Sequence, residues 1–310
     1  MRSGILEYDA IVTVARLGGF RAAAAELNMS PSALSNAVAA LETKLKVRLF
    51  NRTTRSVSLT DAGDQFIARI APALLEIGGA IEAINSHRHT PSGHLRINTS
   101  AGAARMIMTP IIFKYLERYP DMTVTIVTEG KLIDVVGQGF DAGIRIAEAV
   151  PQDMIAIPIG GQLRGVVVGA PAYFEHHPRP VAPADLLRHQ CIRARGATGA
   201  IWHWEFERHG ETTTVDVPGA LTLDEMNLIV DAALAGVGLA YLTEFWVASH
   251  IKAGRLMTVL DDWTEPYPGL CLYYPGRRHV PAGLRALIDL IRAHNAENAG
   301  KRELPLATPD

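Results

Sequence analysis

The apolar and polar positions divide the chain into three zones. Up to about residue 60, apolar residues recur at helical spacing in short blocks. Residues 61–88 carry one long helical pattern, and residues 92–297 alternate between strand-like and helix-like pieces. We therefore expect an α-rich N-terminal zone, a long helix and an α/β zone. The last residues, 298–310, are predicted to form a frayed tail.

The first zone has the spacing of a helix–turn–helix. A helix is expected over 6–17, closed by two glycines, and an alanine-rich helix follows over 20–27. After a three-residue turn, a third helix is expected over 31–42, with Ser30 as its N-cap. This arrangement is typical of DNA-binding helix–turn–helix motifs, although any corner of two helices can produce it.

The third expected helix has two different faces. Three apolar residues, spaced four and three apart, make a stripe expected to lie in the core: Leu34, Val38 and Leu41. Another face is small and uncharged: Ser32, Ser35, Asn36 and Ala39. Such a face suits a buried helix, a protein contact or a helix that reads base edges, because amides and hydroxyls can pair with bases in the major groove.

Positive charge is concentrated directly after this helix. The chain has a net charge of −2, yet residues 43–60 contain five basic residues and no acid: Lys44, Lys46, Arg48, Arg52 and Arg55. Two short β pieces around 51–56 predict a wing with Arg52 and Arg55 near its tip, beside Thr53 and Thr54. Such a tip can enter a minor groove or hold phosphates, and a solvated basic face is the alternative.

The second zone predicts a dimerising helix over 61–88. Thr60 is a plausible N-cap, and Pro72 is expected to kink or loosen the helix. Apolar residues repeat every seven positions in two series offset by three: Ile67, Leu74 and Ile81, and Ile70, Ile77 and Ile84. The alternative is a helix that packs on its own domain.

The third zone predicts open α/β sheets. Strands are expected at 95–100, 123–128, 142–146, 155–159, 165–169, 191–195, 202–207, 213–217, 238–242 and 270–274. Helices are expected at 109–119, 131–139, 224–235 and 282–293. A ligand site in such a fold is expected at the carboxyl ends of the strands.

Residues 20–63, FRAAAAELNMSPSALSNAVAALETKLKVRLFNRTTRSVSLTDAG, closely resemble the winged helix–turn–helix of LysR-type transcriptional regulators. The motifs typical of that family are all present: an aromatic residue, an Ala-rich second helix, S-x-x-A-[LV]-S, L-E, V-R-L-F-x-R and L-T-x-A-G. Downstream, RYPDMTVTIV, GFDAGIRI, GVGLAYL and AGRLMTVL resemble the co-inducer domain of the family. The resemblance therefore covers nearly the whole chain.

The resemblance implies a definite domain organisation. It implies a winged helix–turn–helix domain at 1–60 with its motif at about 20–40, a linker helix at 61–88, and an effector-binding domain at 92–297. The effector-binding domain is expected to be α/β and to resemble a periplasmic binding protein. Its two subdomains are expected at 92–162 with 269–297, and at 163–268.

The same resemblance implies which residues touch DNA. Ser32, Ser35 and Asn36 match the base-reading helix, and Arg52 to Arg55 match the wing. The full DNA-binding set is predicted to be Arg21, Ser30, Ser32, Ser35, Asn36, Arg48, Arg52, Thr53, Thr54 and Arg55. For each of these residues, the alternative is an exposed polar side chain without a role.

The resemblance also implies an effector site between the two regulatory subdomains. Its residues are Ser100, Thr128, Glu129, Arg145, Arg195 and Thr198. A structural salt bridge is an equal alternative for Arg145 and Arg195. Because Glu129 is negative, it disfavours a simple carboxylate effector or calls for an amine on that effector.

Other chemistry is not indicated by the sequence. The pairs His87/His89 and His176/His177 have no Cys, Asp or Glu at ligand spacing, so no metal site is expected. No cofactor motif and no set of nucleophile, base and orienting group is present, so no catalytic residue is expected.

Several remaining features are predicted to be structural. Trp202 and Trp204 are expected to share one buried face of a strand, and GGQLRG at 160–165 is expected to be a hinge. The two cysteines, Cys191 and Cys271, are expected to be reduced and structural.

The sequence as a whole predicts a cytoplasmic LysR-type regulator that is not an enzyme. Its expected partners are double-stranded promoter DNA, a small-molecule effector and further copies of itself, as a dimer through the linker helix and as a homotetramer. RNA polymerase is a further candidate partner, and no membrane contact is expected because no long apolar run is present. The alternative is a solute-binding or enzymatic α/β domain with an accessory helix–turn–helix.

Overall fold

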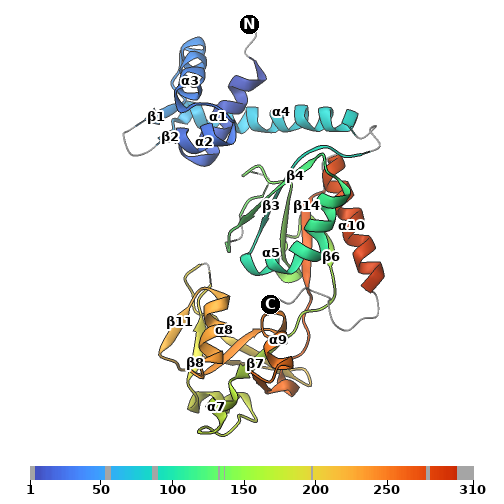
Figure 1. The fold of residues 1–310 in the computed structure, drawn as a ribbon. Helices are drawn as coiled ribbons and strands as arrows, with labels where there is room; N and C mark the ends of the chain where they lie inside the picture. Colours follow the sequence, from blue (N-terminus) through green and yellow to red (C-terminus); the bar gives the residue numbers. More distant parts are fainter. Residues whose placement is uncertain are drawn as a thin grey trace. The chain divides into compact units, whose positions relative to one another are not determined.

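The computed structural model describes residues 4–52, 57–85, 90–131, 133–135, 137–196, 198–276 and 280–298. Within these, no side chain is described for residues 75, 76 and 79–85. The chain divides into two compact units: the residues before Thr90, and the residues Thr90–Arg278 together with those from Gly283 onward. Figure 1 shows the elements of each unit.

The first unit is a winged helix–turn–helix followed by a long helix. Its elements are α1 (Ile5–Leu17), α2 (Phe20–Glu26), α3 (Pro31–Leu45), β1 (Phe50–Arg52), β2 (Val57–Leu59) and α4 (Asp61–Asn85). Strands β1 and β2 pair antiparallel and form the wing. The predicted wing-tip residues Thr53, Thr54 and Arg55 lie outside the described residues. Of the predicted tail at 298–310, Asn298 is the last residue of α10 and the rest lies outside the described residues.

The three short helices enclose a common core. Leu34, Val38 and Leu41 of α3 are fully buried and pack against Ala10 and Ile11 of α1 within one apolar cluster. The predicted core stripe of α3 is therefore confirmed. Fixing this stripe in the core determines which face α3 turns outward.

Helix α4 runs through Pro72 without interruption. Its start is capped by Thr60, whose hydroxyl oxygen accepts a hydrogen bond of 3.0 Å from the Gly63 N–H. In the described part of the predicted seam, Leu74 is half-buried and Ile77 is 41% exposed. The side chains of Ile81 and Ile84 lie outside the described residues.

The second unit contains two five-stranded sheets. The first has the order β4-β3-β5-β14-β6. Its strands are β3 (Gly93–Thr99), β4 (Met122–Thr128), β5 (Ala142–Ile146), β6 (Met154–Ile159) and β14 (Leu270–Pro275). Strands β4, β3 and β5 are parallel, whereas β14 runs antiparallel to β5 and β6. We call the part built on this sheet the first subdomain.

The second sheet has the order β11-β8-β12-β7-β13. Its strands are β7 (Gly165–Gly169), β8 (Cys191–Ala194), β11 (Leu221–Leu223), β12 (Leu239–Thr243) and β13 (Met257–Val259). A separate hairpin is formed by β9 (Trp204–Arg208) and β10 (Glu211–Val215). The helical elements are α7 (Pro171–Phe174), η3 (Pro183–Arg188), α8 (Met226–Leu234), η4 (Glu244–Trp246), α9 (Ala248–Lys252) and η5 (Asp261–Trp263). We call this part the second subdomain.

The helix predicted at 109–119 starts earlier than expected. It begins as α5 (Ala101–Ile107), capped by the Ser100 side chain, continues as a π-helix, η1 (Met108–Phe113), and ends as α6 (Lys114–Arg118). Pro110 lies inside the π-helical turn and not at a helix start. Proline lacks an N–H, so a wider turn accommodates it within a continuing helix.

The prediction of a helix at 131–139 is wrong. The described residues of this segment form turns, in which the Asp134 side chain accepts a hydrogen bond from the Gly137 N–H and Gly139 has a φ of +71°. Two glycines and a turn-forming aspartate outweigh the apolar spacing here. A short η2 (Ala147–Ala149) follows β5, and the last helix, α10 (Ala282–Asn298), extends beyond its predicted end.

Two segments of the chain connect the subdomains, and we call them the crossings. The first crossing lies between β6 and β7, and the second lies between η5 and β14. Leu163 and Tyr267, one from each segment, form an antiparallel bridge with N–H···O distances of 2.9 and 2.8 Å. Asn295 of α10 braces the first crossing, because it accepts from the Gly160 N–H (2.8 Å) and donates to the Pro158 carbonyl (2.7 Å). Gly160 has a φ of +71°, which favours glycine at this bend.

Candidate nucleic-acid interface and effector site

The outward face of α3 is uncharged and hydrogen-bonding. Ser30 caps the helix, with its hydroxyl oxygen 3.1 Å from the Ala33 nitrogen and 3.1 Å from the Ser32 hydroxyl. Ser32 and Asn36 are exposed, whereas Ser35 is half-buried. Because the opposite stripe is buried, this face is available to a partner of the first unit.

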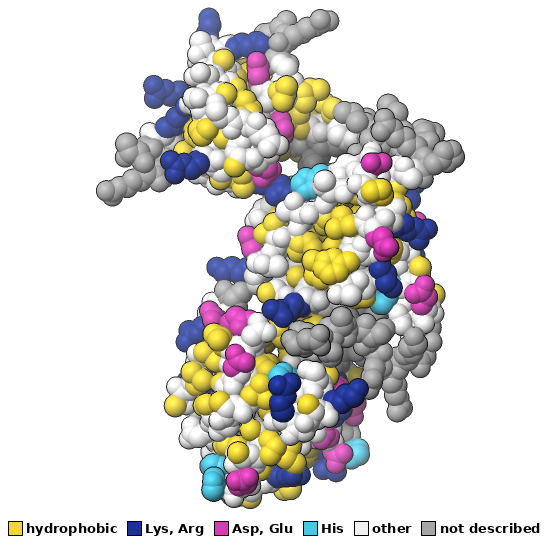
Figure 2. All heavy atoms as spheres, in the orientation of Figure 1, with side chains coloured by type: hydrophobic (Ala, Val, Ile, Leu, Met, Phe, Trp, Pro, Cys, Tyr) yellow, Lys and Arg dark blue, Asp and Glu magenta, His cyan; other side chains and the backbone are white. Residues whose placement is uncertain are grey.

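Exposed basic side chains lie on the end of α3 and on the elements next to it. Lys44, Lys46 and Arg48 are exposed at and after the end of α3, and Arg21 is exposed on α2. Figure 2 shows Lys and Arg side chains gathered over the region of α3 and the wing. Cations beside an uncharged hydrogen-bonding face match the division between phosphate contact and base contact in DNA binding.

Arg52, at the end of β1, is engaged by three other side chains of the domain. It forms an ion pair of 3.0 Å with Glu42 and donates a hydrogen bond of 3.1 Å to the Ser35 hydroxyl oxygen. Its guanidinium carbon lies 4.5 Å from the centre of the Phe20 ring, a cation–π arrangement. Arg52 therefore connects the wing to both α2 and α3.

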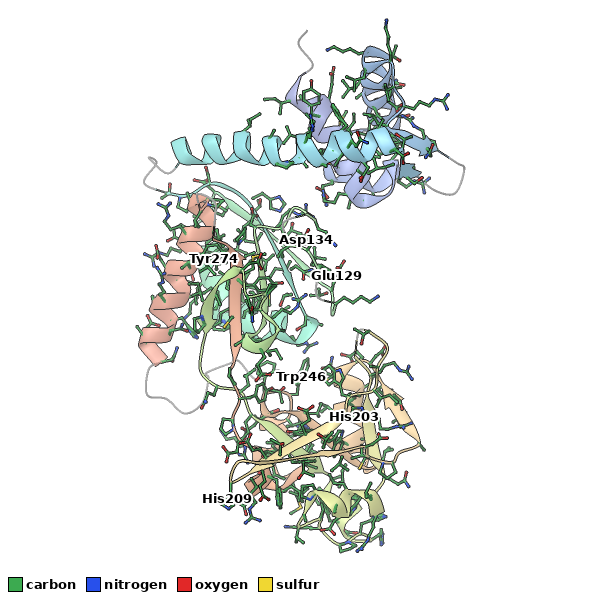
Figure 3. All side chains as sticks on the ribbon, turned by 180° about the vertical axis from the view of Figure 1, so that it is seen from behind. Glu129, Asp134, His203, His209, Trp246 and Tyr274 are labelled. Atoms are coloured by element: carbon green, nitrogen blue, oxygen red, sulfur yellow. The ribbon has the colours of Figure 1, made fainter. Side chains whose placement is uncertain are left out.

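In the first subdomain, three predicted effector residues lie at the carboxyl ends of parallel strands. Thr128 ends β4 and pairs with Thr99 at the end of β3, and Glu129 and Ser100 follow them. Glu129 is exposed (labelled in Figure 3), and Ser100 uses its hydroxyl to cap α5 through the Ala103 N–H. The structure therefore brings these residues together at one edge of the sheet.

Arg145 is buried and its guanidinium is engaged by the protein. It donates to the Asn98 side-chain oxygen and to the backbone carbonyls of Glu129 and Lys131, both at 3.0 Å, and of Ile144 at 2.8 Å. Burial lowers its pKa from the ordinary value, and the nearby Tyr273 and Glu129 oppose that shift. Arg145 thus ties the turn after β4 to the neighbouring strands through carbonyl oxygens.

In the second subdomain, the predicted residues lie on the loop after β8. Arg195 and Thr198 are both exposed, and Arg195 donates a hydrogen bond of 3.1 Å to the Gly199 carbonyl. The same loop closes through the bridge between Arg195 and Ile201. Like the Glu129 edge, this loop lies at the carboxyl end of parallel strands, since β8 runs parallel to β11 and β12.

The prediction that both tryptophans lie in the core is half wrong. Trp204 is buried at the start of β9, but Trp202 precedes the strand and is 55% exposed. Its ring lies against Gly196, where an added Cβ would come within 2.4 Å of the indole nitrogen. Trp202 is therefore an exposed aromatic residue on the predicted effector loop, and the glycine opposite it was the available sequence signal.

Trp246 of the second subdomain packs against α5 of the first subdomain. The Arg105 guanidinium of α5 lies 5.4 Å from the centre of the Trp246 ring of η4. Gly102, one turn earlier on α5, would place a Cβ 3.5 Å from the same ring. Figure 3 labels Trp246 on the second subdomain. The packing of α5 on Trp246 is a feature that the sequence patterns did not indicate.

The described residues include a small apolar pocket away from the predicted effector edge. It is lined by Met106, Ile107, Pro110, Ile159, Leu163, Leu270 and His294, beside the crossing segments. None of the six predicted effector residues lines it. Among the described residues, no group of three or more His, Cys, Asp or Glu is arranged to hold a metal ion, and no helix is long and apolar enough to span a membrane.

The cysteines and the pair His176/His177 lie in different environments. Both cysteines are buried, and burial raises the pKa of the Cys191 thiol to about 12. His177 stacks on Tyr173 with ring centres 4.2 Å apart, while His176 is exposed. The pair His87/His89 lies outside the described residues.

A winged helix–turn–helix, a long helix and two α/β subdomains joined by two crossings together define a one-component DNA-binding regulator. Two family models match the chain: the bacterial regulatory helix-turn-helix protein of the lysR family over residues 7–64, and the LysR substrate binding domain over residues 88–296. The chain belongs to the LysR family of transcriptional regulators.

Relatives and solved structures agree with this assignment. The chain is 40% identical over 292 residues to the uncharacterized HTH-type transcriptional regulator YcaN of Escherichia coli, covering 94% of this chain and 96% of the relative. It is 38% identical to the HTH-type transcriptional regulator PgrR of the same organism, covering 95% and 99%. The full-length structure of the Vibrio cholerae virulence activator AphB shares the fold, with a TM-score of 0.65, 23% identity, and coverage of 94% and 100%.

The function follows at the level of the family. The protein is a DNA-binding transcriptional regulator, and its regulatory domain binds a small-molecule effector that modulates promoter binding. The chain matches transcriptional regulators over nearly the whole length of each relative. It is therefore a regulator and not an enzyme with an accessory helix–turn–helix.

Proposed function

We propose that α3 reads base edges through Ser32, Ser35 and Asn36. The observation that carries this proposal is the exposed, uncharged face of α3, fixed by the buried stripe opposite and flanked by cations. Ser30, Arg21 and Arg48 then contact the DNA backbone. Thr53, Thr54 and Arg55 are proposed to do the same from the tip of the wing.

The effector binds at the strand ends that face the two crossings. In the first subdomain, the effector site is formed by Ser100, Thr128 and Glu129. In the second subdomain, it is formed by Arg195, Thr198 and the exposed Trp202. Arg145 belongs to this set as a support, because its guanidinium holds the carbonyls of the turn that carries Glu129. An effector with an amine and a flat apolar part fits a site with a carboxylate and an indole.

The assembly proposed for the protein is a homotetramer built from dimers that pair through α4. The exposed Ile77 on α4 and the seven-residue repeat support the dimer. The protein acts in the cytoplasm, where its DNA is, and RNA polymerase is a partner at activated promoters. The proposed domain limits are those expected from the sequence, with regulatory subdomains at 92–162 plus 269–297 and at 163–268.

A gel-shift titration with the upstream region of the gene itself tests base reading. The wild-type protein should shift this DNA in a salt-sensitive way, and Asn36→Ala should relax base preference at one position by about 1–3 kcal/mol because an amide–adenine pair is lost. Arg48→Ala is the matched control: it should weaken all sequences alike and lower the salt slope by about one. Equal loss of preference in both variants would contradict the division between α3 and the cations.

A further inference from the structure

Two donor groups of Arg52 are already committed within the protein. Its Nη2 donates to a Glu42 side-chain oxygen at 3.0 Å, and its Nη1 donates to the Ser35 hydroxyl oxygen at 3.1 Å. The guanidinium also lies over the Phe20 ring. The side chain is 33% exposed, so most of it packs against the domain.

Glu42 is itself held rigidly. Its other oxygen accepts from the backbone N–H groups of Leu49 (2.8 Å) and Phe50 (3.0 Å), so the carboxylate joins the last turns of α3 to the start of β1. The carboxylate and the guanidinium neutralise each other. A neutralised pair contributes less to counterion release than a free cation, and Arg52 is therefore a poor candidate for a phosphate contact.

The contact with Arg52 determines how Ser35 can bond. A hydroxyl has one donor hydrogen and accepts through its lone pairs. An arginine has no acceptor, so one of the two lone pairs of the Ser35 oxygen accepts in this contact. The Arg52 cation polarises the hydroxyl, which makes Ser35 a stronger donor and its second lone pair a weaker acceptor. Within the part of the chain that the structure describes, the O–H group of Ser35 donates to no protein acceptor, so its hydrogen is available to a partner of α3.

We propose that Arg52 is a positioning residue that makes Ser35 a hydrogen-bond donor to a base, and so selects against cytosine at the position facing Ser35. In the major groove, guanine, adenine and thymine each present an acceptor, whereas cytosine presents only its amino donor. This inference rests on the proposed role of α3 as the base-reading helix. It replaces the expectation that Arg52 grips phosphate from the wing.

Three full-length variants test the proposal. Ser35→Ala removes the hydroxyl, and Arg52→Lys keeps the charge and the pairing with Glu42 but loses the planar fork that reaches both partners. The double variant Arg52→Met with Glu42→Gln keeps the net charge and leaves an oxygen for the Leu49 and Phe50 N–H groups. Each variant is titrated against the promoter site and against sites in which every base pair is replaced in turn, over a series of salt concentrations.

Wild-type protein should bind the cytosine-substituted site about tenfold more weakly than the native site at the position facing Ser35. All three variants should lose that discrimination at the same position, with an unchanged salt slope and an unchanged unfolding temperature for Arg52→Lys. Combining Ser35→Ala with Arg52→Lys should give no further loss, because both act through one hydroxyl.

Two results would overturn the proposal. In the first, the Met/Gln double variant lowers the salt slope by about one and keeps the discrimination against cytosine, which identifies Arg52 as a phosphate contact. In the second, Asn36→Ala relaxes the base preference at the position it faces, while Ser35→Ala or Arg52→Lys changes the base preference at no position. If neither Ser35→Ala nor Asn36→Ala alters any base preference, it is the proposed role of α3 that fails.

Discussion

At the scale of single residues, a tyrosine and a histidine in the second subdomain form a pair that titrates. The Gln190 N–H donates to the Tyr173 hydroxyl oxygen at 3.1 Å, and that hydroxyl lies 3.1 Å from Nδ1 of His189. Tyr173 and His189 are both buried. Since the tyrosine oxygen already accepts, its hydrogen is best placed to donate to a neutral His189.

We predict that this pair makes the regulatory domain less stable in acid. Burial lowers the pKa of His189, the neighbouring His177 lowers it further and Asp185 opposes the shift. The unfolded chain therefore takes up the proton first, and stability falls as the pH drops below about 6.5 towards the lower pKa of the folded state. Thermal unfolding between pH 5 and 8 measures this slope.

His189→Gln should reduce that slope, because an amide oxygen accepts the tyrosine hydrogen at every pH. Burial also lowers the pKa of His250 and of His294, so these two residues account for a remaining slope. Tyr173→Phe should cost about 1–2 kcal/mol at pH 7, since the partly buried Gln190 N–H loses its acceptor. His176→Gln, at an exposed position, is the control. A slope that His189→Gln leaves unchanged would place the acid sensitivity elsewhere in the chain.

At the scale of elements, the spacing of apolar residues predicted a helix correctly where one face of the helix packs in the core and the other does not. The stripe of Leu34, Val38 and Leu41 could be predicted because a helix with a period of 3.6 must bury those three positions together. The segment 131–139 has similar spacing, yet Gly137, Gly139 and Asp134 favour turns. Local turn chemistry therefore decided the structure where no strong stripe was present.

The candidate site was predictable in part, for a related reason. Exposure of Ser32 and Asn36 follows from the helical wheel of α3 alone. The link between Ser35 and Arg52 joins residues 17 positions apart in different elements, so spacing within one element cannot reveal it. Trp202 begins the predicted strand but lies outside the observed one, because β9 begins two residues later.

The brace between α10 and the first crossing gives a prediction at this scale. Asn295→Ala removes the hydrogen bonds to the Gly160 N–H and the Pro158 carbonyl, and should lower stability by about 1–2 kcal/mol. Amide hydrogen exchange should quicken in residues 158–164 before the rest of the sheet. Arg292→Ala on the exposed side of the same helix should change neither quantity, and equal effects would argue against a local brace.

At the scale of the whole molecule, the proposed assembly depends on α4. Ile77 is 41% exposed within the single chain, so Ile77→Glu should leave the subunit folded and place a charge in the dimer seam. We predict that this variant loses the tetramer in analytical ultracentrifugation and binds promoter DNA at least tenfold more weakly, because paired half-sites need a dimer.

The matched control is Val181→Glu, at a position that is 80% exposed in the second subdomain. It adds the same charge outside the seam and should leave the assembly unchanged. A tetramer that survives Ile77→Glu would contradict the proposed role of this seam in the assembly.

The strand order of the first subdomain also constrains when that subdomain can fold during synthesis. Strand β14 lies between β5 and β6, and β6 has no other partner in the described sheet. A nascent chain that ends before residue 270 therefore exposes the facing edges of both strands, whereas every strand of the second sheet has already been synthesised. The second subdomain is thus free to fold first. The first subdomain can complete its sheet only after β14 has been synthesised, although its other strands come earlier in the chain.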